Sequence, residues 1–469
     1  MTRTLGALQA DISGDVVLPD SPDYEPARKP AIARFCDVYP QAVVLCETPE
    51  DVSETISFAK RYGLRTATRS GGHCFAGRSS TEGIVIDVRP MRSVSVSDDV
   101  ATVGAGARLG EVYDALDEHG LTIPAGCGPS VGISGLTLGG GLGILGRKHG
   151  LTSDNLLGAQ VVLADGRIVE CDGHHHGDLF WALRGAGGGN FGVVTSLVFK
   201  TIPAPTATAF HLTWQHRDAA SVIDAWQHWA PVAPDELAAS LLITASGDVE
   251  EPPVANVFGA MIGTEAEAAE LLDDMVVRAG AAPASKFLEH MPYREAKRCL
   301  AELGPGDERP DGHQFSKSEF FRRRLPAEAA AALVENLSEG RIAGQSRELD
   351  FTPWGGAYNR VPAEATAFAH RAELFALLHV VVVDPGTSTV EREAARDWLS
   401  RSWGLVRPWG SGGVYPNWPD PDLEAWPRAY HGENLERLAR VKRRYDPEGF
   451  FRPRRTLSGR PPNGGVPAT

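Results

Sequence analysis

Long apolar runs are missing from this sequence. No stretch approaches the roughly 20 consecutive apolar residues that a membrane-spanning helix needs. The first residues, MTRTLGALQADISGDVV, also lack the apolar core that marks a secretory signal peptide. We therefore expect a cytoplasmic protein that has no membrane among its partners.

Positive charge is in short supply as well. The 469 residues include 46 Lys and Arg against 60 Asp and Glu, which gives a formal net charge of -14. A protein that binds nucleic acid neutralises phosphates with a basic surface, and this composition offers no basic excess. We therefore expect no nucleic acid partner, whereas a small neutral or cationic substrate is compatible with the charge.

Cysteine is scarce and scattered. Six cysteines occur, without the Cys-x-x-Cys spacing of a zinc site or the density of a disulfide framework. The run His174, His175 and His176 is another candidate for metal binding. Adjacent side chains point apart in most conformations, so we predict a surface turn at this run and no metal.

The composition itself is that of a globular protein, 42% apolar and 23% charged, over a length that allows two or three domains. Prolines within residues 202–205 mark a boundary, because proline cannot continue the interior of a sheet. Before this boundary, short apolar strands alternate with helices. Between residues 206 and 407, strand-like segments alternate with helices rich in Ala and Glu, which predicts an antiparallel sheet flanked by helices and an α+β fold.

Hydrophobic periodicity and end signals place the individual elements. In the first part we expect strands at 42–45, 65–68, 84–87, 101–104 and 191–199, a hairpin of 159–163 with 167–171, and helices at 52–62 and 109–119. In the second part we expect strands at 208–214, 238–244, 254–262, 314–320, 348–353 and 374–383, and helices at 219–229, 265–278, 327–339 and 391–403. A last helix is expected at 435–445.

Glycine is concentrated in residues 124–155, PAGCGPSVGISGLTLGGGLGILGRKHGLTSDN, which carry little charge. Glycine has no Cβ and adopts backbone angles that other residues avoid, so this run is suited to bring backbone close to a large, flat, partly anionic cofactor. The run Arg69-Ser70-Gly71-Gly72-His73 supplies a partner for it. Adjacent glycines expose successive N–H groups as an anion-binding nest, Arg69 can neutralise a phosphate, and His73 would lie at the edge of the cofactor.

A third glycine cluster, residues 104–110, lies between an expected strand and an expected helix. The dinucleotide-binding pattern Gly-x-Gly-x-x-Gly needs a glycine where Leu109 stands. NAD binding is therefore disfavoured, and these glycines predict a strand-to-helix turn near the cofactor.

Residues 69–73, 135–143 and 179–195 together resemble the FAD-linked oxidases of the vanillyl-alcohol-oxidase/PCMH superfamily, nearest the berberine-bridge-enzyme-like branch. The C-terminal segment 415–420, YPNWPD, with a following helix that ends at Asp446-Pro447, is similar to the same branch. The resemblance implies a PCMH-type FAD-binding domain of two α/β subdomains, made of residues 1–205 and 408–469, in which the C-terminal segment folds back. Residues 206–407 would form the substrate-binding domain.

The resemblance also implies FAD joined covalently to the ring of His73. Doubly linked members add a thioether from a cysteine directly before Pro-x-Val-Gly. Here Gly128 stands at that position and Cys127 lies one residue earlier, so we expect the single link through His73. Val131 would stand where small side chains admit dioxygen. The residues implied around the cofactor are Arg69, Ser70, Gly71, Gly72, His73, Gly77, Cys127, Gly128, Val131, Gly132, Ser134, Gly135, Leu138, Gly139, Gly140, Gly141, Gly143, Asn155, Gly189, Asn190, Val193 and Asn417.

The catalytic base departs from the branch. Its members commonly use the second tyrosine of Tyr-x-Asn-Tyr, where this chain has Trp418, and an indole has no useful proton acceptor. The substitute that we favour is His379, on a strand that the resemblance places over the flavin, because imidazole titrates near neutral pH. Lys317 and Tyr415 are further candidates, and a structural role stays open for each of the three.

The sequence thus predicts an FAD-linked oxidase. It would take a hydride from an alcohol, an amine or a phenolic small molecule, an intermediate of specialised metabolism, and would be reoxidised by O2, as a monomer or a homodimer. Two alternatives stay open: a flavoenzyme that catalyses oxidative cyclisation, rearrangement or oxygenation, and a flavin-bearing binding protein without turnover.

Overall fold

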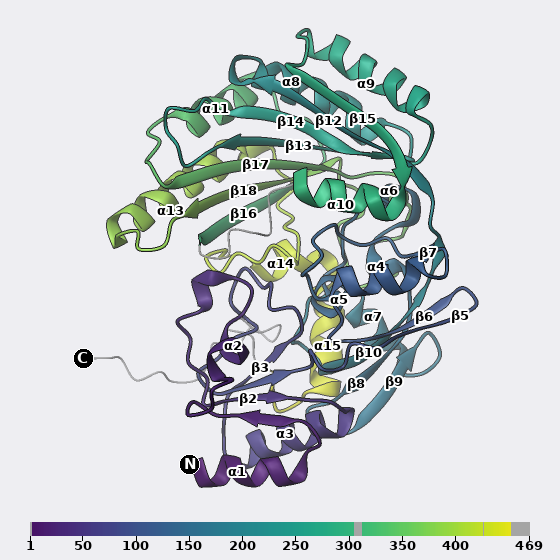
Figure 1. The fold of residues 1–469 in the computed structure, drawn as a ribbon, viewed down its shortest axis with the longest axis vertical. Helices are drawn as coiled ribbons and strands as arrows, with labels where there is room; N and C mark the ends of the chain where they lie inside the picture. Colours follow the sequence, from purple (N-terminus) through teal and green to yellow (C-terminus); the bar gives the residue numbers. More distant parts are fainter. Residues whose placement is uncertain (1, 304–311, 425, 452–469) are drawn as a thin grey trace.

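The computed structural model describes residues 2–303, 312–424 and 426–451. A seven-stranded sheet lies at the top of Figure 1, and a four-stranded and a five-stranded sheet lie below it. Helix α5 (Ile133–Leu138), within the glycine-rich run, lies between the upper sheet and the two lower ones. The glycine-rich backbone is therefore placed at the junction of the two halves of the molecule.

The four-stranded sheet has the order β1-β2-β4-β3, and its last three strands are parallel. A parallel neighbour requires a crossover, which α3 (Pro49–Arg61) provides between β2 and β3. Thr48 caps this helix by accepting a hydrogen bond from the amide of Asp51. The strands are β1 (Asp15–Val17), β2 (Ala42–Leu45), β3 (Thr66–Arg69) and β4 (Ile84–Asp87), with α1 (Thr2–Asp11) and α2 (Tyr24–Arg28) alongside.

The five-stranded sheet is antiparallel and has the order β5-β6-β10-β8-β9. Its apolar side chains join those of the four-stranded sheet in one core, to which Leu438, Val441 and Tyr445 of the C-terminal helix also belong. The elements are β5 (Val94–Ser97), β6 (Val100–Gly104), α4 (Leu109–Asp117), β7 (Leu121–Thr122), α6 (Gly146–His149), β8 (Leu156–Val162), β9 (Ile168–Asp172), α7 (Gly177–Leu183), β10 (Val193–Lys200), β11 (Ile202–Pro203), α14 (Trp426–His431) and α15 (Leu435–Tyr445).

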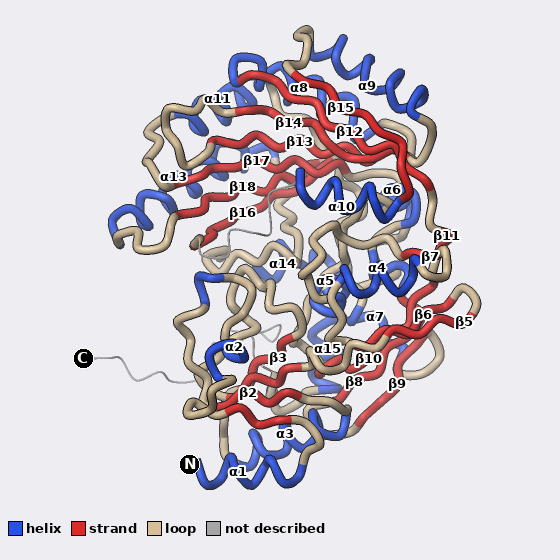
Figure 2. The backbone as a smooth tube through the Cα atoms, viewed as in Figure 1, coloured by secondary structure: helices blue, strands red, loops and turns tan. Residues whose placement is uncertain are grey.

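The upper sheet is antiparallel throughout and has the order β15-β12-β14-β13-β17-β18-β16. Figure 2 shows its outer face covered by α8 (Ala219–Trp229), α9 (Glu265–Ala279), α11 (Ala327–Ser338) and α13 (Thr389–Val406). Short helix α12 (Ala357–Arg360) follows β17. The strands are β12 (Thr206–Gln215), β13 (Leu237–Ala245), β14 (Val254–Met261), β15 (Ser285–Pro292), β16 (His313–Phe321), β17 (Gln345–Pro353) and β18 (Phe375–Val383).

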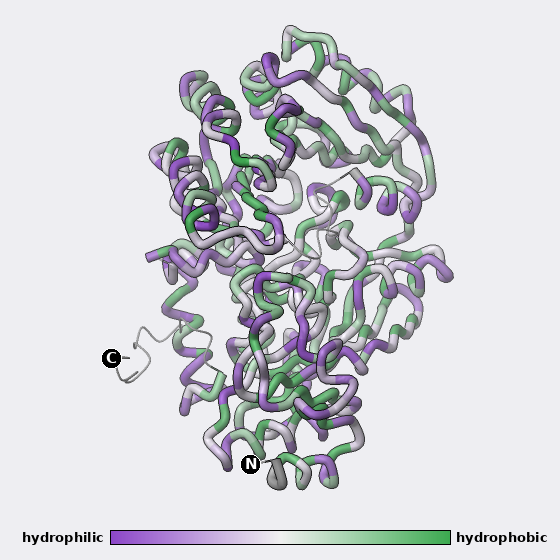
Figure 3. Tube along the Cα trace, turned by 60° about the vertical axis from the view of Figure 1, so that its left-hand side comes forward, coloured by the Kyte–Doolittle hydropathy of each residue, from purple (hydrophilic) through white to green (hydrophobic). Residues whose placement is uncertain are grey.

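The two faces of the upper sheet have different neighbours. Side chains such as Leu349 and Leu377 belong to the core that the outer helices cover, whereas Leu378, Val380 and Val382 form a separate cluster with Trp418. We call the face that carries this second cluster the inner face. Helix α10 (Tyr293–Leu303) covers the β12–β14 end of the inner face. In Figure 3, hydrophobic and hydrophilic residues alternate along the outer helices, as expected for helices with one buried side.

Most elements expected from the sequence are confirmed. The helix at 219–229 has the predicted bounds, and the other predicted helices and strands of the upper half agree within a few residues. The elements that were not predicted include α5, β15 and α10. A glycine-rich run favours no helix, and the apolar residues of β15 do not alternate with polar ones. In α10, the buried Tyr293, Ala296 and Leu300 recur at helical spacing, a signal that the prediction did not use. The division into domains at residues 205 and 408 stays a prediction.

Two buried arginines connect the halves. The guanidinium of Arg371 donates to both carboxylate oxygens of Asp154 at 2.7 and 2.8 Å, and the two side chains are 3% and 8% exposed. Arg147 donates to the carbonyl oxygens of Pro231, Ala233 and Trp354. These contacts fix the upper sheet over the glycine-rich run.

Substitution Arg371→Met is expected to lower the free energy of unfolding by about 3–5 kcal/mol, because it leaves the carboxylate of Asp154 buried without its cation. Chemical denaturation measures this change. The matched control is Arg278→Met, which removes the exposed pair with Asp274 and should cost at most about 1 kcal/mol. Equal losses in the two variants would contradict the prediction.

Candidate active site

Two glycine-rich loops touch through their backbones. A Cβ added to Gly71 would lie 2.2 Å from the amide nitrogen of Gly132, and one added to Gly132 would lie 2.3 Å from the amide nitrogen of Gly71. No other residue fits at either position without moving backbone. The two loops that were predicted to bind the cofactor are therefore in contact, and glycine at both positions permits this contact.

His73 is held by the same pair of loops. Its Nε2 atom lies 3.1 Å from Oγ of Ser130. The hydroxyl groups of Ser70 and Ser134 both donate to the carbonyl oxygen of Ala105, at 2.8 and 2.6 Å. One carbonyl oxygen thus ties the loop that carries His73 to the first turn of α5.

A third glycine-rich segment reaches the end of α5. The amides of Gly185 and Gly187 donate to the carbonyl oxygen of Leu138 at 3.1 and 2.8 Å, and both glycines have positive φ. The side chain of Asn190 donates to the carbonyl oxygens of Ala186 and Gly187, which holds this segment in its turn.

The C-terminal segment closes the run from the other side. Asn417 donates through Nδ2 to the carbonyl oxygen of Leu136 at 2.8 Å and to the hydroxyl oxygen of Tyr415 at 3.0 Å. The amide of Gly141 donates to the same hydroxyl oxygen. A Cβ on Gly139 would lie 2.0 Å from Oδ1 of Asn417, so glycine is required there too. Burial raises the pKa of Tyr415 to about 12.

A flat cofactor with phosphates fits this arrangement. Three side-chain-poor segments converge on α5, and a Cβ built on Gly135 meets nothing within 4 Å. Backbone amides of such segments can approach a pyrophosphate closely, which bulkier residues would prevent. His73, fixed by Ser130, stands at the side of the same surface.

Two carboxylates on the inner face of the upper sheet were not found from the sequence. Glu348 and Asp350 lie on β17, and Asp350 is directly opposite Leu378 on β18. Residues directly opposite in an antiparallel pair project on the same face, so Asp350 shares the face of Leu378 and Trp418. Burial, followed by the charge of Glu348, raises the pKa of Asp350 to about 7. The alternation of acidic with apolar residues in RELDF was the available signal.

A buried lysine was also missed. Lys297 of α10 donates to the carbonyl oxygens of Ala125 and Gly126 and to the hydroxyl of Tyr113, which itself donates to Gly126. Desolvation lowers the pKa of Lys297 to about 8. These two carbonyl groups directly precede Cys127, so Lys297 holds the start of the loop that contacts His73.

Comparison with known proteins decides the family. Residues 40–172 match the family model "FAD binding domain", and residues 414–455 match "Berberine and berberine like". Over 450 residues the chain is 35% identical to the uncharacterized FAD-linked oxidoreductase YgaK of Bacillus subtilis, covering 94% of this chain and 96% of that protein. It is 30% identical to berberine bridge enzyme-like 28 of Arabidopsis thaliana over 88% of this chain and 83% of that one.

The chain belongs to the berberine-bridge-enzyme-like family of FAD-linked oxidoreductases. Its fold agrees with solved members of the family. The structure of BBE-like 28 from Arabidopsis thaliana superimposes with a TM-score of 0.86 at 27% identity, covering 97% and 99% of the two chains. A chitooligosaccharide oxidase superimposes with a TM-score of 0.84 at 25% identity, covering 98% and 100%. The predicted α+β class with its helix-flanked antiparallel sheet is therefore confirmed.

Within this berberine-bridge-enzyme-like fold, His379 lies on the outer face of the upper sheet and does not face the glycine-rich run as predicted. Its Nδ1 atom is 2.9 Å from Oγ of Ser402 on α13, among the outer helices, and the side chain is fully buried. Leu377 also faces these helices, and Leu378 is the residue of this strand that lies on the inner face. The prediction turned His379 toward the cofactor, but side chains alternate along a strand, and here the even-numbered residues lie on the inner face. Burial lowers the pKa of His379 to about 3, so it stays neutral.

Lys317, a candidate for the base, and Arg69, predicted to neutralise a phosphate, both have partners within the protein. Lys317 donates to Asp420 at 2.8 Å and stands 5.4 Å from the ring of Trp403. The guanidinium of Arg69 donates to the carbonyl oxygens of Ala27, Arg28 and Ser79, so its hydrogen bonds support the domain interior instead of a phosphate. Desolvation lowers the pKa of Arg69 to about 10.

The remaining predicted residues have diverse surroundings. Asn155 donates to the carbonyl oxygens of His149 and Leu151 and so closes its own turn. Val193 is a core residue at the start of β10.

Cys127 is partly exposed and packs with Ile144 near α10. The amide of Val131 donates to the carbonyl oxygen of Gly128 in a tight turn. Positive φ values at Gly72, Gly77, Gly140, Gly141 and Gly189 explain glycine there, and Gly143 packs against the carbonyl oxygen of Ala125.

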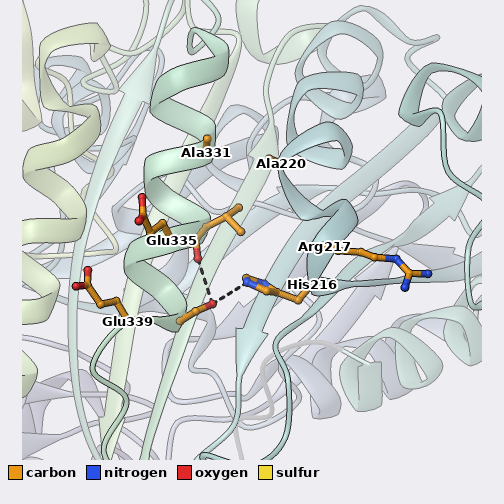
Figure 4. Close-up of a pocket in the computed structure, with 8 residues that line it drawn as sticks. His216, Arg217, Ala220, Ala331, Glu335 and Glu339 are labelled. Carbon is orange, nitrogen blue, oxygen red and sulfur yellow. Dashed lines mark hydrogen bonds between the residues drawn. The ribbon is translucent and has the colours of Figure 1, made fainter.

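A different cavity opens among the outer helices (Figure 4). His216 Nε2 lies 2.9 Å from Oγ of Ser338, which donates to the carbonyl oxygen of Val334. Burial lowers the pKa of His216. The helices around this cavity cover the outer face of the upper sheet, so it is separate from the glycine-rich surface. Its lining residues are His216, Arg217, Ala220, Ala331, Val334, Glu335, Ser338 and Glu339.

Substitution Lys297→Met should lower the free energy of unfolding by about 1–3 kcal/mol, because it leaves two carbonyl groups and a tyrosine hydroxyl without their buried donor. Denaturant titration gives the value. Lys286→Met, which removes only a partly exposed pair with Asp273, is the matched control, and its loss should stay below about 1 kcal/mol. A loss no larger for Lys297→Met than for the control would show that the contact is dispensable.

Proposed function

We propose that this FAD-dependent oxidoreductase is an oxidase. It takes a hydride from an alcohol, an amine or a phenolic small molecule and passes the electrons to dioxygen. The observation that carries the proposal is the convergence of side-chain-poor backbone around His73, beneath a sheet face that bears carboxylates. A substrate between these two surfaces would lie against the flavin on one side and against ionisable groups on the other.

FAD would be held mainly by backbone. The amides of residues 71–73, 132–143 and 185–190 would cradle the pyrophosphate and ribityl groups, because these segments leave the closest approach open. Asn417 and Tyr415 hold the glycine run in shape by their hydrogen bonds to Leu136 and Gly141. Since those side chains are engaged with backbone, their role is to position the loop.

His73 is the residue that we propose as the covalent attachment point. Its contact with Ser130 fixes the orientation of the imidazole before any cofactor arrives. Cys127 lies one residue before the position that a second link would need, where the chain has Gly128. We therefore propose one covalent link.

When bound, the flavin supplies a two-electron acceptor for the hydride. The chain supplies position and proton transfer. The inner face of the upper sheet excludes water with Leu378, Val380, Val382 and Trp418, and this apolar wall would lie against the carbon skeleton of the substrate. Fixing the donor carbon against the cofactor removes much of the entropic barrier of a bimolecular reaction.

Solved relatives act on different substrates. One is a chitooligosaccharide oxidase, and a variant of berberine bridge enzyme is described as a reticuline dehydrogenase. Sugar and alkaloid chemistry thus occurs on this fold. The probes for this chain should therefore include a sugar, an aromatic alcohol and an amine.

The oxidase proposal predicts that at least one of cellobiose, benzyl alcohol and benzylamine bleaches the flavin without air, and that air restores the colour with release of hydrogen peroxide. Absorbance spectroscopy and a peroxide assay follow both events. If bleached protein recovers its colour only with an added artificial acceptor, the protein is a dehydrogenase and the oxidase proposal is wrong.

The attachment proposal predicts that wild-type protein keeps its flavin fluorescence on a denaturing gel. His73→Ala should lose this fluorescence, because no covalent bond would then survive denaturation, while Cys127→Ala should keep it. Fluorescence that survives in His73→Ala would place the link elsewhere.

A further inference from the structure

The strand β17 turns two acids toward the inner face. Arg347, Leu349 and Phe351 project into the outer layer, where Arg347 donates to carbonyl oxygens at the end of α11 and the other two join the apolar core. Side chains alternate along a strand, so Glu348 and Asp350 project the opposite way. Two carboxylates therefore stand two residues apart on the face turned toward the glycine-rich run.

Asp350 is surrounded by apolar neighbours. Leu378 on β18 and Leu242 on β13 are directly opposite it, and Trp418 packs against Leu378. None of these three side chains titrates. The charged group that acts on Asp350 is Glu348, on the same strand. The next residues along the row are Ser318 on β16 and Asn256 on β14, both uncharged.

One oxygen of this carboxylate has no partner. Oδ1 of Asp350 is buried and makes no hydrogen bond within the part of the chain that the structure describes. Leaving a buried carboxylate oxygen unsatisfied is costly, and native proteins keep such groups where a ligand or a reaction uses them. The residue as a whole is partly exposed.

We propose that Asp350 is the catalytic base of the oxidation, and that Glu348 holds it ready to accept a proton. This inference rests on the proposed function. It follows from the placement of Asp350 on the inner face, its unpartnered oxygen and its apolar neighbours. The carboxylate of Asp350 thus supplies a proton acceptor, which the indole of Trp418 cannot.

The candidates predicted from the sequence are either engaged in hydrogen bonds or lie on the other face of the sheet. The hydroxyl oxygen of Tyr415 accepts hydrogen bonds from Gly141 and Asn417. His379 lies in the outer layer, and Lys317 is paired with Asp420. Among the candidates considered, Asp350 combines an open acceptor with the correct face.

The reaction balances as follows. The substrate loses a proton from its O–H or N–H group to Oδ of Asp350 and a hydride from the adjacent carbon to FAD, and its C–O or C–N single bond becomes a double bond. Dioxygen then takes two electrons and two protons and leaves as hydrogen peroxide. One of these two protons is replaced by the proton that Asp350 gives up, so the carboxylate is regenerated for the next turnover.

The test compares wild type with Asp350→Asn in anaerobic flavin reduction by whichever of cellobiose, benzyl alcohol and benzylamine reduces the wild type. A base must be ionised to act, so the wild-type rate should rise with pH through about 7 and level off above it. Asp350→Asn should lose this rise and be slower by about 10²–10⁴-fold above pH 8, the usual contribution of a general base. Rates within threefold of wild type would overturn the proposal.

A second readout needs no substrate. Sulfite binds to oxidised flavin and bleaches it, and a nearby carboxylate opposes this anion. Asp350→Asn should bind sulfite about tenfold more tightly than wild type at pH 8, and the difference should shrink at pH 6, where Asp350 carries a proton. Equal affinities at both pH values would overturn the placement of Asp350 beside the flavin.

Two controls separate the outcomes. Glu335→Gln removes a carboxylate from the outer cavity of Figure 4 and should change neither readout. Asp350→Asn relieves a buried charge, so its melting temperature at pH 8 should be no lower than that of wild type. If none of the three probes reduces wild-type flavin, none of them is a substrate, and the sulfite titration alone decides whether Asp350 faces the cofactor.

Discussion

The site depends on backbone that approaches backbone more closely than any side chain would allow. Gly71 and Gly132 are in mutual contact, and Gly139 packs against the side chain of Asn417. Each of these contacts joins segments that are remote in the sequence, and each leaves no room for Cβ. The loop that carries His73, the run that begins at α5 and the C-terminal segment can therefore form one surface only because glycine stands at their crossing points.

Much of this surface could be predicted from the sequence. Glycine is needed where backbone approaches closely, so the composition of the run at 124–155 and of the loop 69–73 predicted that the two segments meet, as they do at Gly71 and Gly132. The parallel strands β2 and β4 are equally evident, because parallel strands buried on both faces read as continuous apolar runs such as Ala42–Leu45. Local composition is enough in these cases.

The opposite side of the site was not predictable in the same way. His379 was placed over the flavin because it stands on the correct strand, yet the strand is turned so that Leu378 faces inward. Facing direction in a sheet depends on a register of one residue, which long-range pairing sets. The hydrogen bonds of Arg69 to Ala27 and Arg28 form only where the N-terminal segment packs against β3. The hydrogen bond from Lys297 to the carbonyl oxygen of Ala125 forms only because α10 packs there. No local sequence pattern predicts these partners.

The contact between Asn417 and Leu136 joins residues 281 positions apart. A contact between residues so far apart forms only after both have been synthesised, and closing a long loop costs more chain entropy than closing a short one. Tyr415 and Asn417, which hold the glycine run in shape, are thus synthesised after most of the chain. A chain that ended before residue 415 would lack Tyr415 and Asn417, and with them the hydrogen bonds to Gly141 and Leu136 that hold the glycine-rich run in shape.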